Sequence, residues 1–168
     1  MPEKKTLERA RKDAREGKSP STQAGEFVRE EIEHVREGKH GARSAKQAIA
    51  IGLSKARRAG VKLPPPKGGA PVSATTRRQA ARDYAKGQKG QAKPSPRRSR
   101  AVLKALQREG SEAASETALS RQAHRSARQR GPASRSLAAQ KAVRTKGKAG
   151  LQRAARKAAR TRQLEAGR

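Results

Sequence analysis

Large apolar residues are scarce in this chain, and their distribution limits where a core can form. Only 19 of the 168 residues are Leu, Ile, Val or Phe. That share lies well below the roughly 20% under which a strongly charged chain is expected to be disordered. Nine of the 19 lie between Phe27 and Leu63. We therefore expect one small folded region rather than a single globular domain that spans the chain.

Charge is as unevenly distributed as the apolar residues. The formal net charge is +29, with 43 Lys and Arg against 14 Asp and Glu. Residues 1–42 are close to neutral, with ten basic and nine acidic groups, whereas residues 67–168 hold 27 basic and five acidic groups. So large an excess of positive charge opposes compaction and favours polyanions as partners.

The region rich in apolar residues has the pattern of an all-α helical hairpin. Apolar residues at helical spacing predict helices over about 22–37 and 45–59, preceded by a polar helix over 4–16. The run of three prolines from Pro64 then ends the segment. The predicted core of the hairpin consists of Phe27, Val28, Ile32, Val35, Ile49, Leu53 and Ala56.

The tetrapeptide Arg-Glu-Gly-Lys occurs twice, at 15–18 and 36–39, and Arg-Glu-Gly recurs at 108–110. Gly reaches the left-handed conformation that ends many helices, so we interpret these repeats as helix stops. Gly52 lies inside the predicted second helix of the hairpin. It indicates either close packing of a neighbouring helix or a tolerated glycine.

These patterns divide the chain into three parts. We expect a helical N-terminal unit at 1–63, a Pro/Gly linker at 64–73, and a basic low-complexity tail at 74–168 that is largely disordered with short helices. The hairpin alone buries few large side chains, so it is expected to gain from self-association, from the first helix or from a ligand. Residues 22–63 are thus a candidate surface for self-association or for a protein partner.

Lys and Arg on Ala-rich segments are suited to phosphate, because binding to nucleic acid releases condensed counterions. In the tail, A-A-x-K-A-x-R-T occurs at 138–145 and again at 154–161, which puts its Lys and Arg on one helix face. For the tail, the alternative is that these cations only keep the chain solvated. For the cations at the end of the second hairpin helix, the alternative is that they stabilise the carbonyl end of that helix. The candidate nucleic-acid-binding residues are Lys55, Arg57, Arg58, Arg77, Arg78, Arg97, Arg98, Arg100, Lys141, Arg144, Lys146, Arg153, Arg156, Lys157, Arg160 and Arg162.

Several function classes find no support in the sequence. The chain has no Cys, which excludes thiolate chemistry and zinc–thiolate sites. No P-loop, nucleophile elbow or dinucleotide fingerprint is present, so we expect no enzyme and no cofactor. Glu30 and His34 are spaced for a shared ligand, but two ligands make no metal site, and we interpret them as a surface pair. With no apolar leader or spanning segment, we expect a cytoplasmic protein, associated with the nucleoid.

The run from Ser21 to Gly60 resembles a bacterial family of small, strongly basic proteins with an N-terminal domain of unknown function, and the likeness extends over roughly residues 1–66. Ser-Pro-Arg-Arg at 95–98 resembles elements of linker-histone tails, where such residues contact the minor groove; a helix start is the other interpretation. The resemblance implies a helical N-terminal unit and no particular catalytic or binding residue.

Three hypotheses follow for the function. The leading one is an accessory protein that binds DNA without sequence preference. DNA is favoured over RNA because Phe27 and Tyr84 are the only aromatic residues, and single-strand binders usually stack bases on such rings. The second is an RNA- or ribosome-associated protein. The third is a protein-interaction module at 22–63 with a solubilising tail.

Overall fold

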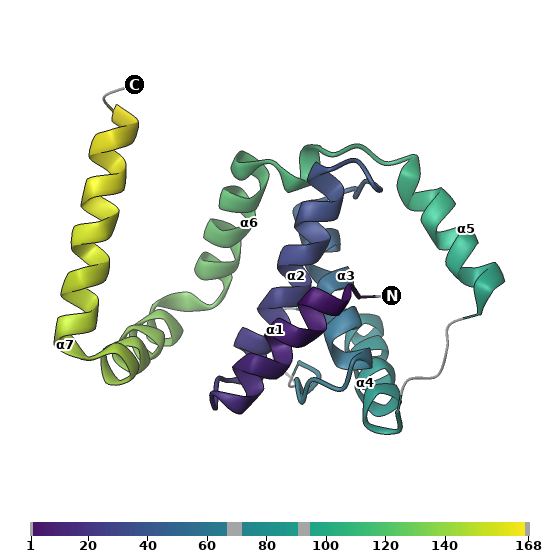
Figure 1. The fold of residues 1–168 in the computed structure, drawn as a ribbon, viewed down its shortest axis with the longest axis horizontal. Helices are drawn as coiled ribbons and strands as arrows, with labels where there is room; N and C mark the ends of the chain where they lie inside the picture. Colours follow the sequence, from purple (N-terminus) through teal and green to yellow (C-terminus); the bar gives the residue numbers. More distant parts are fainter. Residues whose placement is uncertain (1, 67–71, 91–94, 167–168) are drawn as a thin grey trace. The chain divides into compact units, whose positions relative to one another are not determined.

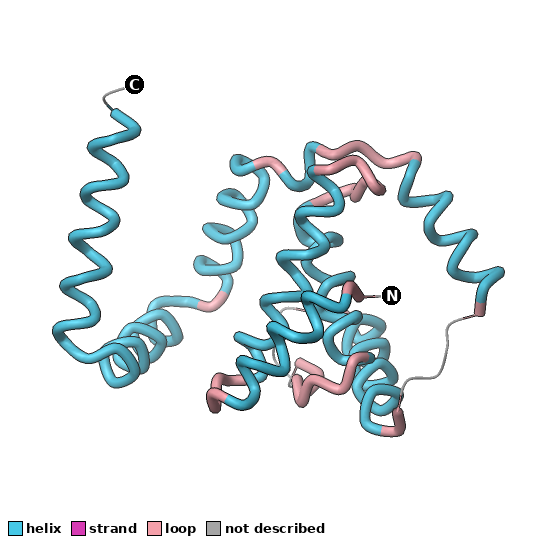
Figure 2. Tube along the Cα trace, in the orientation of Figure 1, coloured by secondary structure: helices cyan, strands magenta, loops and turns pink. Residues whose placement is uncertain are grey.

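The computed structural model describes residues 2–66, 72–90 and 95–166, and these form helices and connecting loops without a β-strand (Figure 1, Figure 2). The all-α prediction is confirmed. The elements are α1 (Lys4–Arg15), α2 (Pro20–Arg36), α3 (Ala45–Arg58), α4 (Ala74–Gln88), α5 (Pro96–Gln107), the 3₁₀ turn η1 (Glu112–Ala114), α6 (Glu116–Gln129) and α7 (Gly131–Ala166). The chain forms two compact units, a first unit at Met1–Ala123 and a second unit at His124–Arg168.

Side-chain caps start the two hairpin helices, and left-handed glycines follow their ends. Ser19 accepts a hydrogen bond from the backbone N–H of Thr22, and Ser44 accepts one from that of Gln47. Glycines with positive φ follow α1, α2 and α3 at Gly17 (70°), Gly38 (72°) and Gly60 (92°). The first two Arg-Glu-Gly sequences are therefore helix stops of the kind that the sequence predicts.

The third Arg-Glu-Gly sequence behaves differently. Helix α5 ends at Gln107, and Gly110 does not adopt a positive φ. The backbone N–H of Ala42 instead donates to the carbonyl oxygen of Gly110 at 3.1 Å, and that of Gly41 donates to Leu106 at 2.9 Å. This Arg-Glu-Gly thus belongs to a loop that binds the turn after α2, so the local motif alone does not determine the conformation.

Helices α2 and α3 pack against each other, with α1 on α2 and α4 on α3 (Figure 1). Of the predicted core, Phe27, Val35 and Ala56 are buried, whereas the other members, Val28, Ile32, Ile49 and Leu53, are only partly buried. Alanine supplies most of the remaining buried apolar residues, which form two clusters. One consists of Ala10, Ala24, Phe27, Ala56 and Val61, and the other of Val35, Ala42, Ala48, Ala113 and Ala114.

These clusters show how so few large side chains form a core. Helix α1 contributes Ala10, with Leu7 packed against the same cluster. Ala113 and Ala114 come from η1, which contacts both α2 and α3. The Nε–H of Arg36 donates to the carbonyl oxygen of Ala114 at 2.9 Å and holds this turn in place. The hairpin is therefore completed by segments on both sides of it in the sequence.

A buried carboxylate attaches α4 to α3. Asp83 is 1% exposed, and its oxygens accept hydrogen bonds from Ser54 Oγ at 2.6 Å, Arg58 Nε at 2.8 Å and Gln79 Nε2 at 3.1 Å. Helix α4 lies beyond the boundary that the sequence places at 64–73. Residues 67–71 of that linker lie outside the described residues, and the first unit as a whole continues to Ala123.

Replacing Asp83 with Asn is expected to lower the free energy of unfolding of the first unit by about 2 kcal/mol, because a buried acceptor of charged hydrogen bonds is lost. The loss stays at that level because Arg58 is half exposed and can turn to water. Hydrogen exchange of the α4 amides should accelerate by roughly 30-fold if these amides exchange through unfolding of the first unit. Glu8→Gln on α1, at an exposed carboxylate, is the matched control and should leave the exchange unchanged. Equal exchange in the two variants would contradict the role assigned to Asp83.

The prediction of a largely disordered tail is wrong. Beyond α4 the chain forms α5, α6 and the long helix α7, which is broken at Gly147 (φ 65°, ψ 169°) (Figure 1). Ala, Arg, Lys and Gln have high intrinsic helix propensity. The shortage of large apolar residues limits tertiary packing, and it does not prevent local helix formation. In keeping with this, no residue with assigned burial in α7 is buried.

Candidate nucleic-acid interface

The three candidate cations at the end of α3 make contacts inside the first unit. The Lys55 ammonium forms ion pairs with Glu30 and Glu31, and Arg58 pairs with Asp83. Arg57 is buried, and its Nε–H donates to the carbonyl oxygen of Leu63 at 3.2 Å. Burial lowers the pKa of the Arg57 guanidinium, and the Asp83 carboxylate opposes that shift. These contacts favour a structural role for the cations of α3.

Lysines of the two Arg-Glu-Gly-Lys sequences are also partnered. Lys18 contacts Asp13 at 2.7 Å and Glu16 at 2.7 Å, and hydrogen bonds to these carboxylates raise the pKa of its ammonium. The same contact with Lys18 lowers the pKa of Glu16. Lys39 pairs with Glu37 at 2.9 Å, and hydrogen bonding to that carboxylate raises its pKa. Much of the positive charge near these turns is therefore balanced locally.

The candidate arginines of α4 and α5 lie near the starts of their helices. Arg77 is half-buried, and Arg78 is exposed, one turn after the Ser73 cap. The segment at 95–98 forms the start of α5, with Pro96 in the first turn, and Ser95 makes no side-chain cap hydrogen bond. The other candidates there, Arg97, Arg98 and Arg100, are exposed. The helix-start interpretation of Ser-Pro-Arg-Arg therefore fits the backbone.

The repeated octapeptide has the same local structure in both copies on α7. In the first copy, Thr145 Oγ1 donates to the carbonyl oxygen of Lys141 at 2.9 Å, and in the second Thr161 Oγ1 donates to that of Lys157 at 3.1 Å. Gly147 lies between the two copies, so each occupies its own straight segment of the helix. The repeat thus presents the same pair of cations twice.

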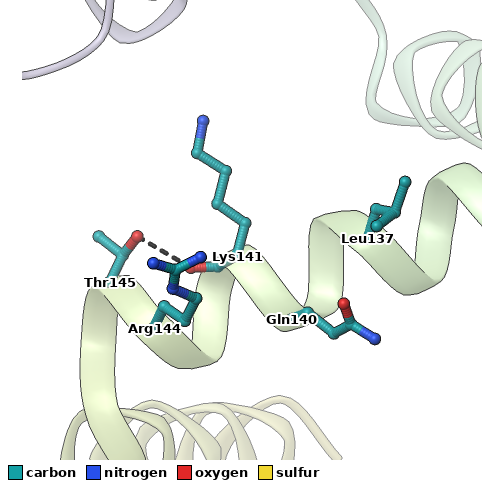
Figure 3. Close-up of a pocket in the computed structure, with 5 residues that line it drawn as sticks. All are labelled: Leu137, Gln140, Lys141, Arg144 and Thr145. Atoms are coloured by element: carbon teal, nitrogen blue, oxygen red, sulfur yellow. Dashed lines mark hydrogen bonds between the residues drawn. The ribbon is translucent and has the colours of Figure 1, made fainter.

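Cations of α7 extend into solvent. Figure 3 shows Lys141 and Arg144 three residues apart on the helix, with Leu137 one turn before Lys141, and five residues there line an open hollow. Leu137 is itself 66% exposed, so the hollow has no apolar core. The candidate cations of this helix are all exposed: Lys141, Arg144, Lys146, Arg153, Arg156, Lys157, Arg160 and Arg162. An extended cationic surface of this kind is suited to a polyanion rather than to a small enclosed ligand.

The two units differ in their ion pairing. Every ion pair recorded among the described residues joins two side chains of the first unit. The second unit holds 14 Lys and Arg and a single acidic residue, Glu165, for a net charge of +13. Its positive charge is therefore available to an external partner, whereas the 13 acidic residues of the first unit offset part of the charge of its 29 Lys and Arg.

Sequence reasoning missed the polar groups buried in the first unit. Glu30 and Glu31 are both buried, and His40 is buried beside Glu31, with His40 Nε2 at 3.3 Å from Glu31 Oε1. The signal was present, because Phe27, Glu31 and Val35 are spaced by four and all three are fully buried on one face of α2. A carboxylate in the middle of an apolar helix face is a sign of a buried polar cluster.

Residues 17–67 match a family of unknown function, DUF6496. The match confirms the N-terminal domain of unknown function that the sequence resemblance indicated. It covers α2, α3 and the loops beside them, and it excludes the cationic helix α7. No curated protein and no solved structure matches the chain. Among the described residues, no helix combines the length and apolar character that crossing a membrane requires.

Proposed function

We propose that this protein is a nucleoid-associated accessory protein that binds duplex DNA through the phosphate backbone without sequence preference. The observation that carries the proposal is the cationic second unit, where the cations of α7 are exposed and have no ion-pair partner among the described residues. Each phosphate that such a cation neutralises releases counterions, and this favours binding at low salt. The first unit, where carboxylates pair with part of the positive charge, is then a docking or self-association unit.

Aromatic residues favour duplex DNA over a single strand as the partner. Phe27 is fully buried, so its ring is inaccessible to a base. Tyr84 is half-buried on α4. Single-strand binders use exposed aromatic rings as stacking platforms, and the chain has no other aromatic residue. Backbone contact by Lys and Arg needs no such rings and suits a duplex.

Fluorescence anisotropy of a labelled DNA duplex, titrated with the full chain at several salt concentrations, tests the proposal. With about eight phosphate contacts, log K should fall against log salt with a slope near −7. Scrambling the duplex sequence should leave the affinity unchanged. Absence of binding at low salt would refute the proposal. Competition with structured RNA distinguishes the partners, because an RNA that displaces the duplex at much lower concentration would assign the chain to RNA instead.

A further inference from the structure

Two histidines and a glutamate meet at the C-terminal end of α2. Glu31 and His34 are three residues apart on the helix and so share a face. After the left-handed Gly38 the chain turns back, which brings His40 to the same place. One potential ligand atom from each of the three lies within 4.8 Å of the other two. We call these three residues the His–Glu cluster.

Burial makes this cluster unlike an ordinary surface group. The side chain of Glu31 is fully buried, that of His40 is 9% exposed, and that of His34 is 14% exposed. Neither carboxylate oxygen of Glu31 receives a hydrogen bond of normal geometry, although the ammonium of Lys55 lies against Oε2. Polar atoms buried at this depth are ordinarily satisfied. Glu31 Oε1 is therefore a buried acceptor that still lacks a donor.

The ring of His40 is oriented as a ligand. Its Nδ1 lies 3.1 Å from the carbonyl oxygen of Gly41, and since a carbonyl only accepts, Nδ1 carries the hydrogen. In the neutral ring Nε2 is then a lone pair, and it faces Glu31 Oε1 at 3.3 Å. A proton on Nε2, which would make the ring an imidazolium, or a metal cation between the two atoms would satisfy this contact. Metal-binding histidines characteristically donate their other ring N–H to a carbonyl or carboxylate in this way.

We propose that Glu31, His34 and His40 bind a zinc ion. Imidazole and carboxylate ligands suit Zn²⁺, and ligands at about 2.0–2.2 Å from it in a tetrahedron stand roughly 3.4 Å apart. Side-chain movements of the order of 1 Å would bring the ligand atoms of the His–Glu cluster from their present spacing to that distance. Three protein ligands leave the fourth position to water.

Neighbouring charges support a cation at this point. Glu3 Oε1 accepts a hydrogen bond from His34 Nε2 at 2.8 Å and so adds a further carboxylate against the cluster. Glu30 is also buried, and its Oε1 has no hydrogen-bond partner, with Lys55 at 3.7 Å. Glu3 and Glu30 thus add two carboxylates to that of Glu31, against the ammonium groups of Lys55 and Lys39. A zinc ion there would tie the end of α2 to the loop before α3, within the region that matches the family.

Zinc binding by the full chain tests the proposal, after treatment with a chelator and dialysis. We expect one zinc ion per chain by elemental analysis, and a tetrahedral visible spectrum when Co²⁺ replaces zinc. His40→Gln and His34→Gln should each weaken zinc binding by at least about 10-fold. His124→Gln is the matched control, because it removes the remaining histidine from exposed α6. It should leave zinc binding unchanged.

Folding is checked separately, since His40 is buried. Helix content by circular dichroism should be the same in His34→Gln as in the unaltered chain, and zinc should raise the melting temperature of the unaltered chain but not of this variant. Failure of the unaltered chain to retain zinc would overturn the proposal. Equal zinc affinity in the His34, His40 and His124 variants would do so too. DNA binding through α7 is a separate measurement and does not depend on either result.

Discussion

Replacing Gly52 with Ala is expected to destabilise the first unit by about 2–3 kcal/mol, because overpacking a close helix contact costs that much. A Cβ at this position would lie 2.6 Å from Val28 Cα, 2.9 Å from Val28 N and 3.0 Å from the carbonyl oxygen of Phe27. All three atoms belong to the backbone of α2, so no side-chain rotation relieves the clash. Ala would gain about 1 kcal/mol in helix propensity over Gly, and the steric cost exceeds that gain.

Gly25 provides the matched control. It also lies inside a hairpin helix, but a Cβ there would have no atom within 4 Å. Gly25→Ala is therefore expected to stabilise the first unit by up to about 1 kcal/mol. Urea unfolding followed by the fluorescence of Tyr84 measures both, because the chain has this single Tyr and no Trp, and Tyr84 lies in the first unit. Equal shifts in the two variants would show that α2 and α3 do not approach closely at Gly52.

The hairpin was predictable because its apolar spacing and its helix stops agree. The residues at its centre were only partly predictable. Apolar spacing predicts a buried stripe through Val28, Ile32 and Val35. In the structure the fully buried residues of α2 at spacing four are instead Phe27, Glu31 and Val35. A charged residue is ordinarily placed at the surface, because burying a charge without a partner is costly. Here Lys55 on α3 supplies an ion-pair partner for Glu31, and His40 lies against the same carboxylate from the loop after α2. No local pattern reveals either contact.

Contacts between distant segments also divide the candidate nucleic-acid-binding residues into paired and unpaired cations. Sequence alone makes Lys55, Arg58 and Lys141 equivalent cations. Their surroundings differ, because the first two meet carboxylates on α2 and α4, and Lys141 has no ion-pair partner among the described residues. Which cations are neutralised inside the fold depends on contacts between distant segments. In the second unit, by contrast, composition alone predicts that most cations lack an ion-pair partner, because the unit has a single acidic residue.

Removing the four cations that the two copies of the repeat share should reduce the salt dependence of DNA binding more than any other change of equal charge. The variant combines Lys141→Gln, Arg144→Gln, Lys157→Gln and Arg160→Gln. If each cation neutralises one phosphate, the slope of log K against log salt should change from near −7 to about −3.5. The loss of affinity between 50 and 200 mM salt should then shrink from about 10⁴-fold to about 10²-fold. Glutamine is a good helix former, so α7 should keep its helicity.

A control of equal charge uses cations that already have carboxylate partners in the first unit. It combines Lys12→Gln, Lys18→Gln, Arg29→Gln and Arg43→Gln, whose partners are Glu16, Asp13, Glu33 and Glu109. Both variants lower the net charge by four, so a general effect of charge on the approach to DNA acts on each alike. Only the α7 variant removes unpaired cations, and only it should change the slope strongly. An equal change of slope in the two variants would mean that DNA responds to the total charge of the chain, and α7 would then have no special part in binding.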